Sequence, residues 1–262
     1  MCFFAAPVTI DRMIRTKLFF AVLWISLLLS MPFLLPLLVL SLPGLRRAKE
    51  RYVHAVSSTW ARFVLFLGGV KVEVRGMERL PEAQNLCIVA NHQSYFDIPL
   101  IMASIPRLVG FIAKKELRYV PFISSWMRAM GCLFIDRKSA RQALAVIEEG
   151  AREIEAGKAK LVFPEGTRSR SSAMGPIRAG ALKLAFRSNS YVVPVTIDGS
   201  YRLLEEHETL VPGRVTLTIH EPISTAGLDR NGQQEATRTI AATLASALPD
   251  YSGRDSKNSQ RS

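Results

Sequence analysis

The chain has 262 residues, and its 34 lysines and arginines against 22 aspartates and glutamates give a formal net charge of +12. This length allows one domain of about 200 residues with a sizeable core, plus a short appendage. The basic excess indicates an anionic partner, either nucleic acid or a negatively charged membrane surface. The sequence has no zinc-finger spacing and no aromatic–basic RNA-binding signature, which argues against nucleic acid.

The first distinct segment is apolar and runs from Leu18 to Leu42 without a charged residue. A helix of this length, at about 1.5 Å per residue, crosses the roughly 30 Å hydrocarbon core of a bilayer. A secretory signal would have a shorter apolar region and a small-residue cleavage site, so we expect this segment to be retained. Basic residues flank both ends, and Pro32 and Pro36 can kink a helix. A tilted single span and a re-entrant hairpin with both ends cytosolic are therefore equal alternatives.

A helix is expected next, from Arg51 to Leu67, because apolar residues recur there every three or four positions. It either packs on the core or lies at the membrane interface with Trp60 at headgroup level. We expect an extramembrane N-terminal segment, a membrane anchor with an interfacial helix, a catalytic domain and a disordered polar tail. Their predicted boundaries are 1–17, 18–68, 69–250 and 251–262.

From residue 70 onward, short apolar runs typical of strands alternate with helical patterns. Strands are expected at 70–74, 86–90, 109–113, 132–135, 161–163, 192–197 and 214–220. The clearest helices are expected at 139–157, opened by the capping box Ser139-x-x-Gln142, and at about 176–187. This alternation predicts an α/β fold with a mixed, partly parallel sheet flanked by helices.

The cysteines and histidines do not form a disulfide framework or a metal site in the sequence. Cys2, Cys87 and Cys132 are an odd number without framework spacing. Cys87 and Cys132 lie in apolar runs, where a free thiol behaves as a small buried hydrophobe. The four histidines are scattered along the chain, so we expect no metal.

The segment Asn91-His-Gln-Ser-Tyr-Phe-Asp97 follows the predicted strand at 86–90, and α/β proteins bind ligands at the carboxyl ends of strands. Five positions separate His92 from Asp97, about 500° of helical rotation, so a regular helix would point the two side chains apart. They can meet only if the chain turns between them. A helix that begins near Asp97, with Pro99 in its first turn, would allow this.

Such a pair suits general-base chemistry. The imidazole of His92 can take a proton from an alcohol, while the carboxylate of Asp97 fixes the tautomer and stabilises the imidazolium. The alternative is structural, because Ser94-x-x-Asp97 resembles a capping box and Asp97 can itself be an N-cap.

Cationic residues follow three other predicted strands. The segment Phe163-Pro-Glu-Gly-Thr-Arg-Ser169 ends with Arg168, whose planar fork suits a phosphate or carboxylate. Arg137 follows the strand at 132–135, and Lys114 follows the strand at 109–113. These cations either converge on an anion pocket or are merely solvated.

Four blocks of this sequence, in order, resemble the glycerolipid acyltransferase family, close to the 1-acylglycerol-3-phosphate acyltransferases. Residues 91–97 resemble the family's NHxxxxD motif, and 131–137, 163–169 and 192–197 resemble its second, third and fourth blocks. The resemblance covers roughly residues 70–222, with no departure at the key positions.

The resemblance implies the acyltransferase fold and a one-step transfer. His92, oriented by Asp97, would deprotonate the free hydroxyl of 1-acyl-glycerol-3-phosphate (lysophosphatidic acid). The hydroxyl would attack the thioester of acyl-CoA or acyl carrier protein directly, giving phosphatidic acid without an acyl-enzyme. The residues implied to bind the acceptor are Glu165, Gly166, Thr167 and Arg168, with help from Arg137. Lys114 is added from its position alone, and no metal or bound cofactor is implied.

The implied setting is an anionic membrane, the inner membrane in a bacterium, with the catalytic domain facing the cytosol. Two alternatives remain open. The first is an acyltransferase with a different lysolipid acceptor. The second is a non-catalytic membrane lipid-binding protein, against which the intact His92 and Asp97 pair argues.

Overall fold

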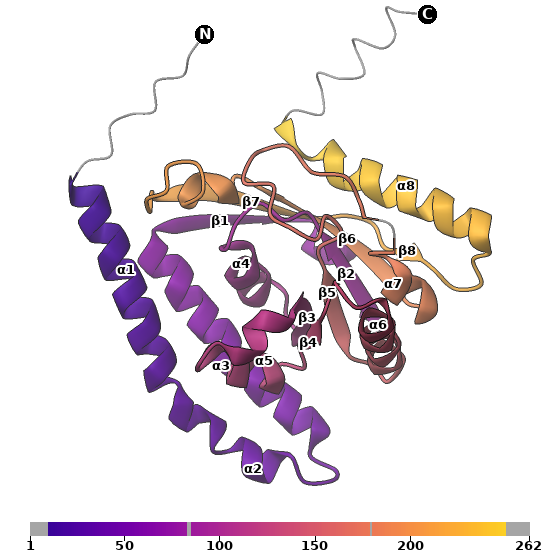
Figure 1. Ribbon diagram of the computed structural model, residues 1–262, viewed down its shortest axis with the longest axis horizontal. Helices are drawn as coiled ribbons and strands as arrows, with labels where there is room; N and C mark the ends of the chain where they lie inside the picture. The colour runs from indigo at the N-terminus through magenta and orange to yellow at the C-terminus, as the bar shows by residue number, and fades with distance from the viewer. Residues whose placement is uncertain (1–9, 83–84, 179, 250–262) are drawn as a thin grey trace, which may run out of the picture.

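A mixed β-sheet forms the middle of the protein in the computed structural model, which describes residues 10–82, 85–178 and 180–249 (Figure 1). Its strands are β1 (Val70–Arg75), β2 (Leu86–Ala90), β3 (Val109–Lys114), β4 (Leu133–Ile135), β5 (Ala159–Val162), β6 (Tyr191–Asp198), β7 (Gly213–Ile219) and β8 (Ile223–Ser224). The order across the sheet is β1-β7-β6-β2-β5-β3-β4, with β8 also paired to β6. Strand β6 is antiparallel to β7 and β8, while the remaining pairs are parallel. The mixed, partly parallel sheet predicted from the sequence is confirmed.

Helices cover both faces of this sheet. They are α1 (Ile10–Leu29), α2 (Leu37–Leu40), α3 (Arg46–Gly68), α4 (Asp97–Ser104), α5 (Ile123–Ala129), α6 (Ala140–Glu155), α7 (Lys183–Arg187) and α8 (Arg230–Ser246). Short 3₁₀ turns are η1 (Met31–Leu34), η2 (Met77–Arg79), η3 (Lys115–Tyr119) and η4 (Ser200–Leu203). Figure 1 shows α1 and α3 along one side of the molecule and α8 on the opposite side.

Alternating residues of β2 show why its sequence is an unbroken apolar run. Leu86 and Ile88 pack into a cluster with residues of α1, α3 and α4. Cys87 and Val89 point to the other face and pack with residues of α6, α7 and α8. A strand that buries both faces needs apolar side chains at every position, as is usual for parallel strands between helices.

The apolar N-terminal segment folds as α1, η1 and α2, after which the chain turns back into α3 (Figure 1). Two indole groups attach it to the rest of the protein: Trp60 Nε1 donates to Ser26 Oγ at 3.1 Å, and Trp126 Nε1 donates to Ser30 Oγ at 2.8 Å. Helix α1 begins at Ile10 and is continuous through the boundary predicted between residues 17 and 18.

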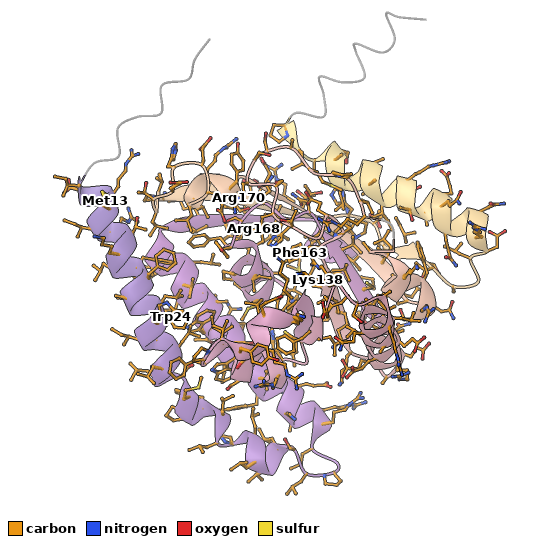
Figure 2. The ribbon with its side chains drawn as sticks, in the orientation of Figure 1. Met13, Trp24, Lys138, Phe163, Arg168 and Arg170 are labelled. Carbon is orange, nitrogen blue, oxygen red and sulfur yellow. The ribbon has the colours of Figure 1, made fainter. Side chains whose placement is uncertain are left out.

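The outer surface of this segment carries exposed large apolar side chains. Figure 2 shows Met13 and Trp24 directed away from the body of the protein, and both are exposed. The others on α1, η1 and α2 are Ile10, Ile14, Leu18, Phe20, Ile25, Leu28, Leu29, Phe33, Leu38 and Val39. In the described part of the chain, no helix alone has the length and apolar composition to cross a bilayer, whereas α1 and the segment Met31–Leu40, bent by 41°, together have both.

Three details differ from the sequence predictions. The helix predicted over 176–187 is wrong in its first half, since only α7 is helical. The chain before α7 is irregular because two of its backbone N–H groups bond the 163–169 turn: that of Gly175 donates to Glu165 Oε2, and that of Arg178 donates to the carbonyl of Pro164. Strand β5 lies about two residues earlier than predicted, so Phe163 follows it. Helices α5 and α8 and the short strand β8 were not anticipated. The predicted disordered tail at 251–262 lies outside the described residues.

Candidate active site

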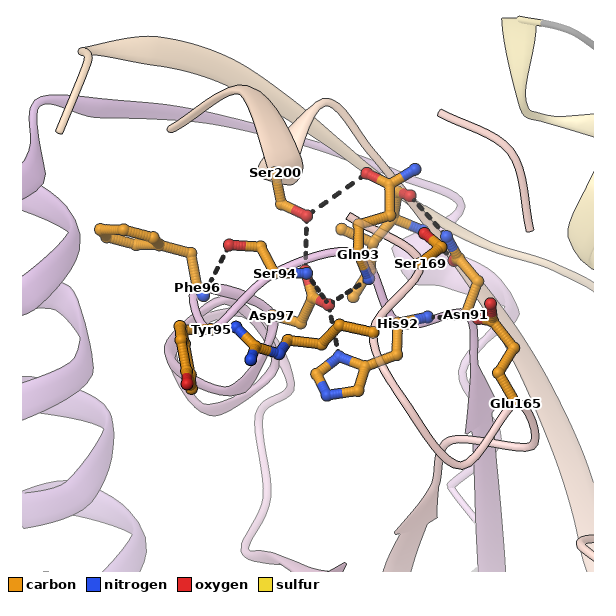
Figure 3. Close-up of polar contacts among 12 residues, drawn as sticks. Asn91, His92, Gln93, Ser94, Tyr95, Phe96, Asp97, Glu165, Ser169 and Ser200 are labelled. Carbon is orange, nitrogen blue, oxygen red and sulfur yellow. Dashed lines mark hydrogen bonds and ion pairs between the residues drawn. The ribbon is translucent and has the colours of Figure 1, made fainter. Parts of the chain in front are cut away.

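The loop between β2 and α4 brings His92 and Asp97 together. His92 lies just after the end of β2, and Asp97 is the first residue of α4, so the chain reverses between them. His92 Nδ1 is 2.7 Å from Asp97 Oδ2 (Figure 3). The turn required by the sequence argument is present, and the helix begins at the predicted residue.

The carboxylate of Asp97 is fully buried and has hydrogen bonds on both oxygens. Oδ2 accepts from His92 Nδ1, from the backbone N–H of Gln93 at 2.7 Å and from that of Ser94 at 2.8 Å. Oδ1 accepts from the hydroxyl of Ser200 at 2.5 Å. The two functions considered from the sequence are therefore combined: Asp97 satisfies loop N–H groups, as in a capping box, and orients the imidazole as well.

The ring of His92 is fixed in a second direction by Phe163. The two rings are stacked, with centroids 3.9 Å apart and an interplanar angle of 13°. An ionised carboxylate only accepts hydrogen bonds, so Nδ1 carries the proton of the neutral ring and Nε2 has a free lone pair. The side chain of His92 is 17% exposed, and Nε2 has no hydrogen-bond partner among the described residues. The free nitrogen is the one that a general base needs.

The backbone of His92 is held by the 163–169 turn. Glu165 Oε1 accepts from the N–H of His92 at 2.7 Å, and the N–H of Ser169 donates to the carbonyl of His92 at 2.7 Å. Glu165 Oε2 accepts from the N–H of Gly175 at 2.6 Å. Burial raises the pKa of the Glu165 carboxyl. Both oxygens of Glu165 therefore face protein N–H groups, and these bonds hold the His92 loop against the 163–169 turn.

Arg168 is also occupied by protein groups. Its Nη1 donates to Glu205 Oε1 at 2.9 Å, and its guanidinium lies 3.4 Å from the ring centroid of Tyr95. Glu205 further accepts from Ser94 Oγ at 2.6 Å and from the N–H of Tyr95 at 2.8 Å. The side chains of Arg168 and Glu205 are only 16% and 5% exposed. The charge of Arg168 is therefore paired with that of Glu205, and Glu205 in turn bonds Ser94 and Tyr95 in the loop that leads to Asp97.

The other predicted binding residues are placed differently. Arg137 reaches the turn, and its Nη1 donates to the carbonyl of Gly166. Thr167 is exposed at the same turn. Lys114 is exposed at the end of β3, opposite Ile135 of β4, and no contact among the described residues joins it to His92. No three His, Cys, Asp or Glu side chains of the described residues are grouped as metal ligands.

Sequence reasoning missed Ser200, Glu205 and the amide of Asn91. Asn91 exchanges hydrogen bonds of 2.7 and 2.8 Å with the backbone of Ile197, which extends the pairing of β2 with β6. Ser200 and Glu205 follow β6, the parallel neighbour of β2. The rule that ligands bind where strands end applies to β6 as well, and the polar residues after 192–197 were a usable signal.

The structure thus shows an α/β protein with a carboxylate–imidazole pair just after the end of strand β2. A family model described as "Acyltransferase" matches residues 71–198. A 1-acyl-sn-glycerol-3-phosphate acyltransferase of Chlamydomonas reinhardtii is 31% identical over 245 residues, which are 92% of this chain and 71% of that protein. The alpha form of the same enzyme in Mus musculus is 33% identical over 168 residues, or 62% of this chain. The chain spans little more than half of the mouse relative, 58% of its length.

A solved structure agrees with these matches. The crystal structure of the 1-acyl-sn-glycerophosphate (LPA) acyltransferase PlsC from Thermotoga maritima superposes with a TM-score of 0.79 at 26% identity. The match covers 94% of this chain and 99% of the other. The chain belongs to the acyltransferase family that these proteins share, and the resemblance of its four blocks to that family is confirmed.

Proposed function

We propose that this protein transfers an acyl chain from acyl-CoA or acyl carrier protein to the free hydroxyl of 1-acyl-sn-glycerol-3-phosphate, giving phosphatidic acid. The relatives named for this reaction support the proposal. The observation that carries it is the 2.7 Å contact between His92 Nδ1 and Asp97 Oδ2, which leaves Nε2 of His92 open.

The proposed reaction is a single displacement at the thioester carbonyl. His92 Nε2 takes the proton of the acceptor hydroxyl as its oxygen bonds to the carbonyl carbon. The carbon–sulfur bond then breaks, and the leaving thiolate takes the proton from the imidazolium. Asp97 remains a carboxylate throughout and stabilises the positive charge on the ring. No protein nucleophile takes part, and Cys87 and Cys132, which are buried, have no role in it.

Acceptor binding is assigned to the groups that remain open at the 163–169 turn. Arg137, Gly166 and Thr167 are proposed to contact the glycerol phosphate, with Lys114 as a more distant cation. Glu165 and Arg168 serve instead to position the His92 loop, since their polar atoms already face protein partners.

The proposed setting is a membrane surface. The apolar side chains exposed on α1, η1 and α2 support residues 18–68 as the membrane anchor. The catalytic domain is proposed to be residues 69–250 and to face the cytosol, where a thioester donor is found. The net charge of +12 favours anionic lipid and attracts acidic carrier protein or CoA. An acceptor in the bilayer and a donor in the cytosol then meet at the interface.

A panel of acceptors and donors tests this function. The protein, purified in detergent, is supplied with acyl-CoA or acyl carrier protein and with lysophosphatidic acid or other lysophospholipids, and the lipid products are identified by mass spectrometry. We expect phosphatidic acid as the main product. Turnover only with another lysolipid would favour that different acceptor, and absence of transfer to any acceptor would favour a lipid-binding protein.

A further inference from the structure

Glu205 lies in the segment that follows β6, and its carboxylate binds the middle of the His92 loop, residues 91–97. Its Oε2 accepts from the hydroxyl of Ser94 at 2.6 Å, and its Oε1 accepts from the backbone N–H of Tyr95 at 2.8 Å. The side chain of Glu205 is 5% exposed. A buried carboxylate needs partners for its charge and its lone pairs, and Glu205 has two of them in this loop.

Asp97 and Glu205 divide the N–H groups of the His92 loop between them. Those of Gln93 and Ser94 donate to Asp97 Oδ2 at 2.7 and 2.8 Å. That of the next residue, Tyr95, donates to Glu205. Ser94 is therefore held twice, its N–H by Asp97 and its hydroxyl by Glu205. A shift of Ser94 would move an N–H group that fixes the Asp97 carboxylate, and with it the partner of the imidazole.

Arg168 balances the charge of Glu205. Its Nη1 donates to Glu205 Oε1 at 2.9 Å, and its guanidinium lies 3.4 Å from the ring centroid of Tyr95. Hydrogen bonds to an ionised carboxylate are shorter and stronger than those between neutral groups. An ionised Glu205, kept so by its cation, therefore holds the loop more firmly than a neutral side chain would.

The same segment bonds the loop at a second point. Ser200, at its start, donates its hydroxyl to Asp97 Oδ1 at 2.5 Å (Figure 3). On the other side, the 163–169 turn bonds the N–H and the carbonyl of His92. Two separate parts of the chain therefore fix the loop, one at the residue that carries the imidazole and one at the residues that fix its carboxylate partner.

We infer that Glu205 is a positioning residue for the general base: it fixes Ser94 and Tyr95, and through them the Asp97 carboxylate that orients the imidazole of His92. Its effect on acyl transfer rests on the proposed function. Glu205 lies outside the four sequence blocks that resemble the family, and it acts through the loop rather than on a reacting atom.

Steady-state kinetics of E205A test this assignment. We expect kcat to fall about 10- to 100-fold and the KM of each substrate to stay within about threefold, because a displaced base slows the chemical step without removing a substrate contact. E205Q is the conservative variant. Its amide oxygen can accept from Tyr95 and Arg168, and its NH₂ group can donate to Ser94 Oγ, so kcat should stay within about fivefold of wild type.

The matched control is E153A, which removes a carboxylate from another ion pair. Glu153 pairs with Lys160, whose side chain is 1% exposed. Lys160 lies opposite Cys87 of β2 and Gly110 of β3, near the starts of these strands, whereas the His92 loop follows the end of β2. E153A leaves a buried cation without its partner, so it should lower the melting temperature at least as much as E205A. Its kcat should stay within about threefold of wild type.

The ring nitrogens of His92 report the geometry of the loop without turnover. In protein with ¹⁵N-labelled histidine, at about pH 8 where an ordinary imidazole is neutral, the chemical shifts of Nδ1 and Nε2 show which nitrogen carries the proton. H92A identifies the signals. Wild type and E153A should have the proton on Nδ1, and E205A should show a mixture of both tautomers because the Asp97 carboxylate no longer stays opposite Nδ1. If wild type transfers no acyl chain, this measurement alone decides the assignment.

The assignment is overturned if folded E205A keeps both the wild-type kcat and the single tautomer, or if its defect is a higher KM for either substrate. An equal fall of kcat in E153A would show that lost stability alone slows the reaction, and would overturn it as well. If E205A does not fold, S94A replaces it, because this change removes only the hydroxyl bond to Glu205 Oε2 and the acceptor of the Phe96 N–H. S94A should lower kcat about 3- to 10-fold, and wild-type kcat and tautomer in S94A would overturn the assignment.

Discussion

The substitution Asp97→Asn removes a charge from the site while keeping almost every hydrogen bond. In the wild type, Oδ2 of Asp97 accepts from His92 Nδ1 and from two backbone N–H groups, those of Gln93 and Ser94. Only the oxygen of an asparagine can take that position, because its NH₂ group would face three donors. The NH₂ group then lies beside Ser200 Oγ, which can accept it and turn its own proton toward Gln93 Oε1, 3.3 Å away in the wild type.

This geometry sets the expected loss of activity. The two backbone N–H groups fix the amide orientation, so His92 keeps the tautomer with a proton on Nδ1 and an open Nε2. What is lost is the charge facing the imidazolium, the difference between a charge-assisted and a neutral hydrogen bond, about 1–2 kcal/mol. At 1.36 kcal/mol per factor of ten, kcat should fall about 5- to 30-fold. A wrong tautomer would instead cost about 10⁴ in kcat, the loss that follows when asparagine replaces the aspartate of a serine-protease catalytic triad.

Release of free thiol from the acyl donor, followed continuously at saturating lysophosphatidic acid, measures this kcat. The far-ultraviolet circular dichroism of Asp97→Asn should match that of wild type. An unchanged kcat would show that the carboxylate charge has no part in the reaction. A loss near 10⁴ in a folded variant would show that the backbone N–H groups do not fix the tautomer.

Three further predictions follow from buried groups. Ser200→Ala leaves Oδ1 of Asp97 without its hydroxyl donor and should lower the free energy of unfolding by about 1.5–3 kcal/mol. The control is Ser188→Ala, which removes a buried hydroxyl that bonds only neutral groups and should cost about 1 kcal/mol. Equal losses for the two variants in denaturant titrations would contradict this prediction. Burial raises the pKa of Cys87 to about 12 and that of Cys132 to about 11, so iodoacetamide at pH 8 should leave both unlabelled in the native protein, and rapid labelling of either would disprove it. Burial raises the pKa of the Glu165 carboxyl, so this group contributes fully to stability below the ordinary glutamate pKa, and the contribution is lost as pH rises through the folded-state pKa. The free energy of unfolding of wild type relative to Glu165→Gln should therefore decrease from about pH 4 to pH 7. A difference between the two proteins that does not change with pH would argue against this.

The fold was largely predictable because central strands such as β2 and β5 are buried on both faces. Short runs such as 86–90 are apolar at every position, a pattern typical of a buried strand. The start of α6 was equally predictable, because Ser139 accepts from the N–H of Gln142 as the capping box predicts. Boundaries set by distant contacts were not predictable. Phe163 continues an apolar run but leaves the strand to stack on His92, a contact between residues far apart in sequence.

The residues of the candidate site were likewise predictable where they are close in sequence, and not where only the tertiary structure brings them together. His92 and Asp97 are five positions apart, so a turn signalled by Pro99 was enough to bring them together. Ser200 is 103 positions from Asp97, so its place after a predicted strand marks it only as a polar residue at the end of a strand, and its bond to that carboxylate is set by the tertiary structure. The partners that change the proposed role of Arg168 come equally from tertiary structure, since Glu205 reaches it across 37 positions.

The most direct test of the account compares acyl transfer to lysophosphatidic acid by wild type and His92→Ala at equal amounts of folded, membrane-associated protein. If the open Nε2 of His92 is the general base, transfer should fall by at least about 10²- to 10⁴-fold while association with anionic vesicles is unchanged. Near-normal transfer by His92→Ala would contradict the role of the imidazole, and with it the mechanism built on its contact with Asp97.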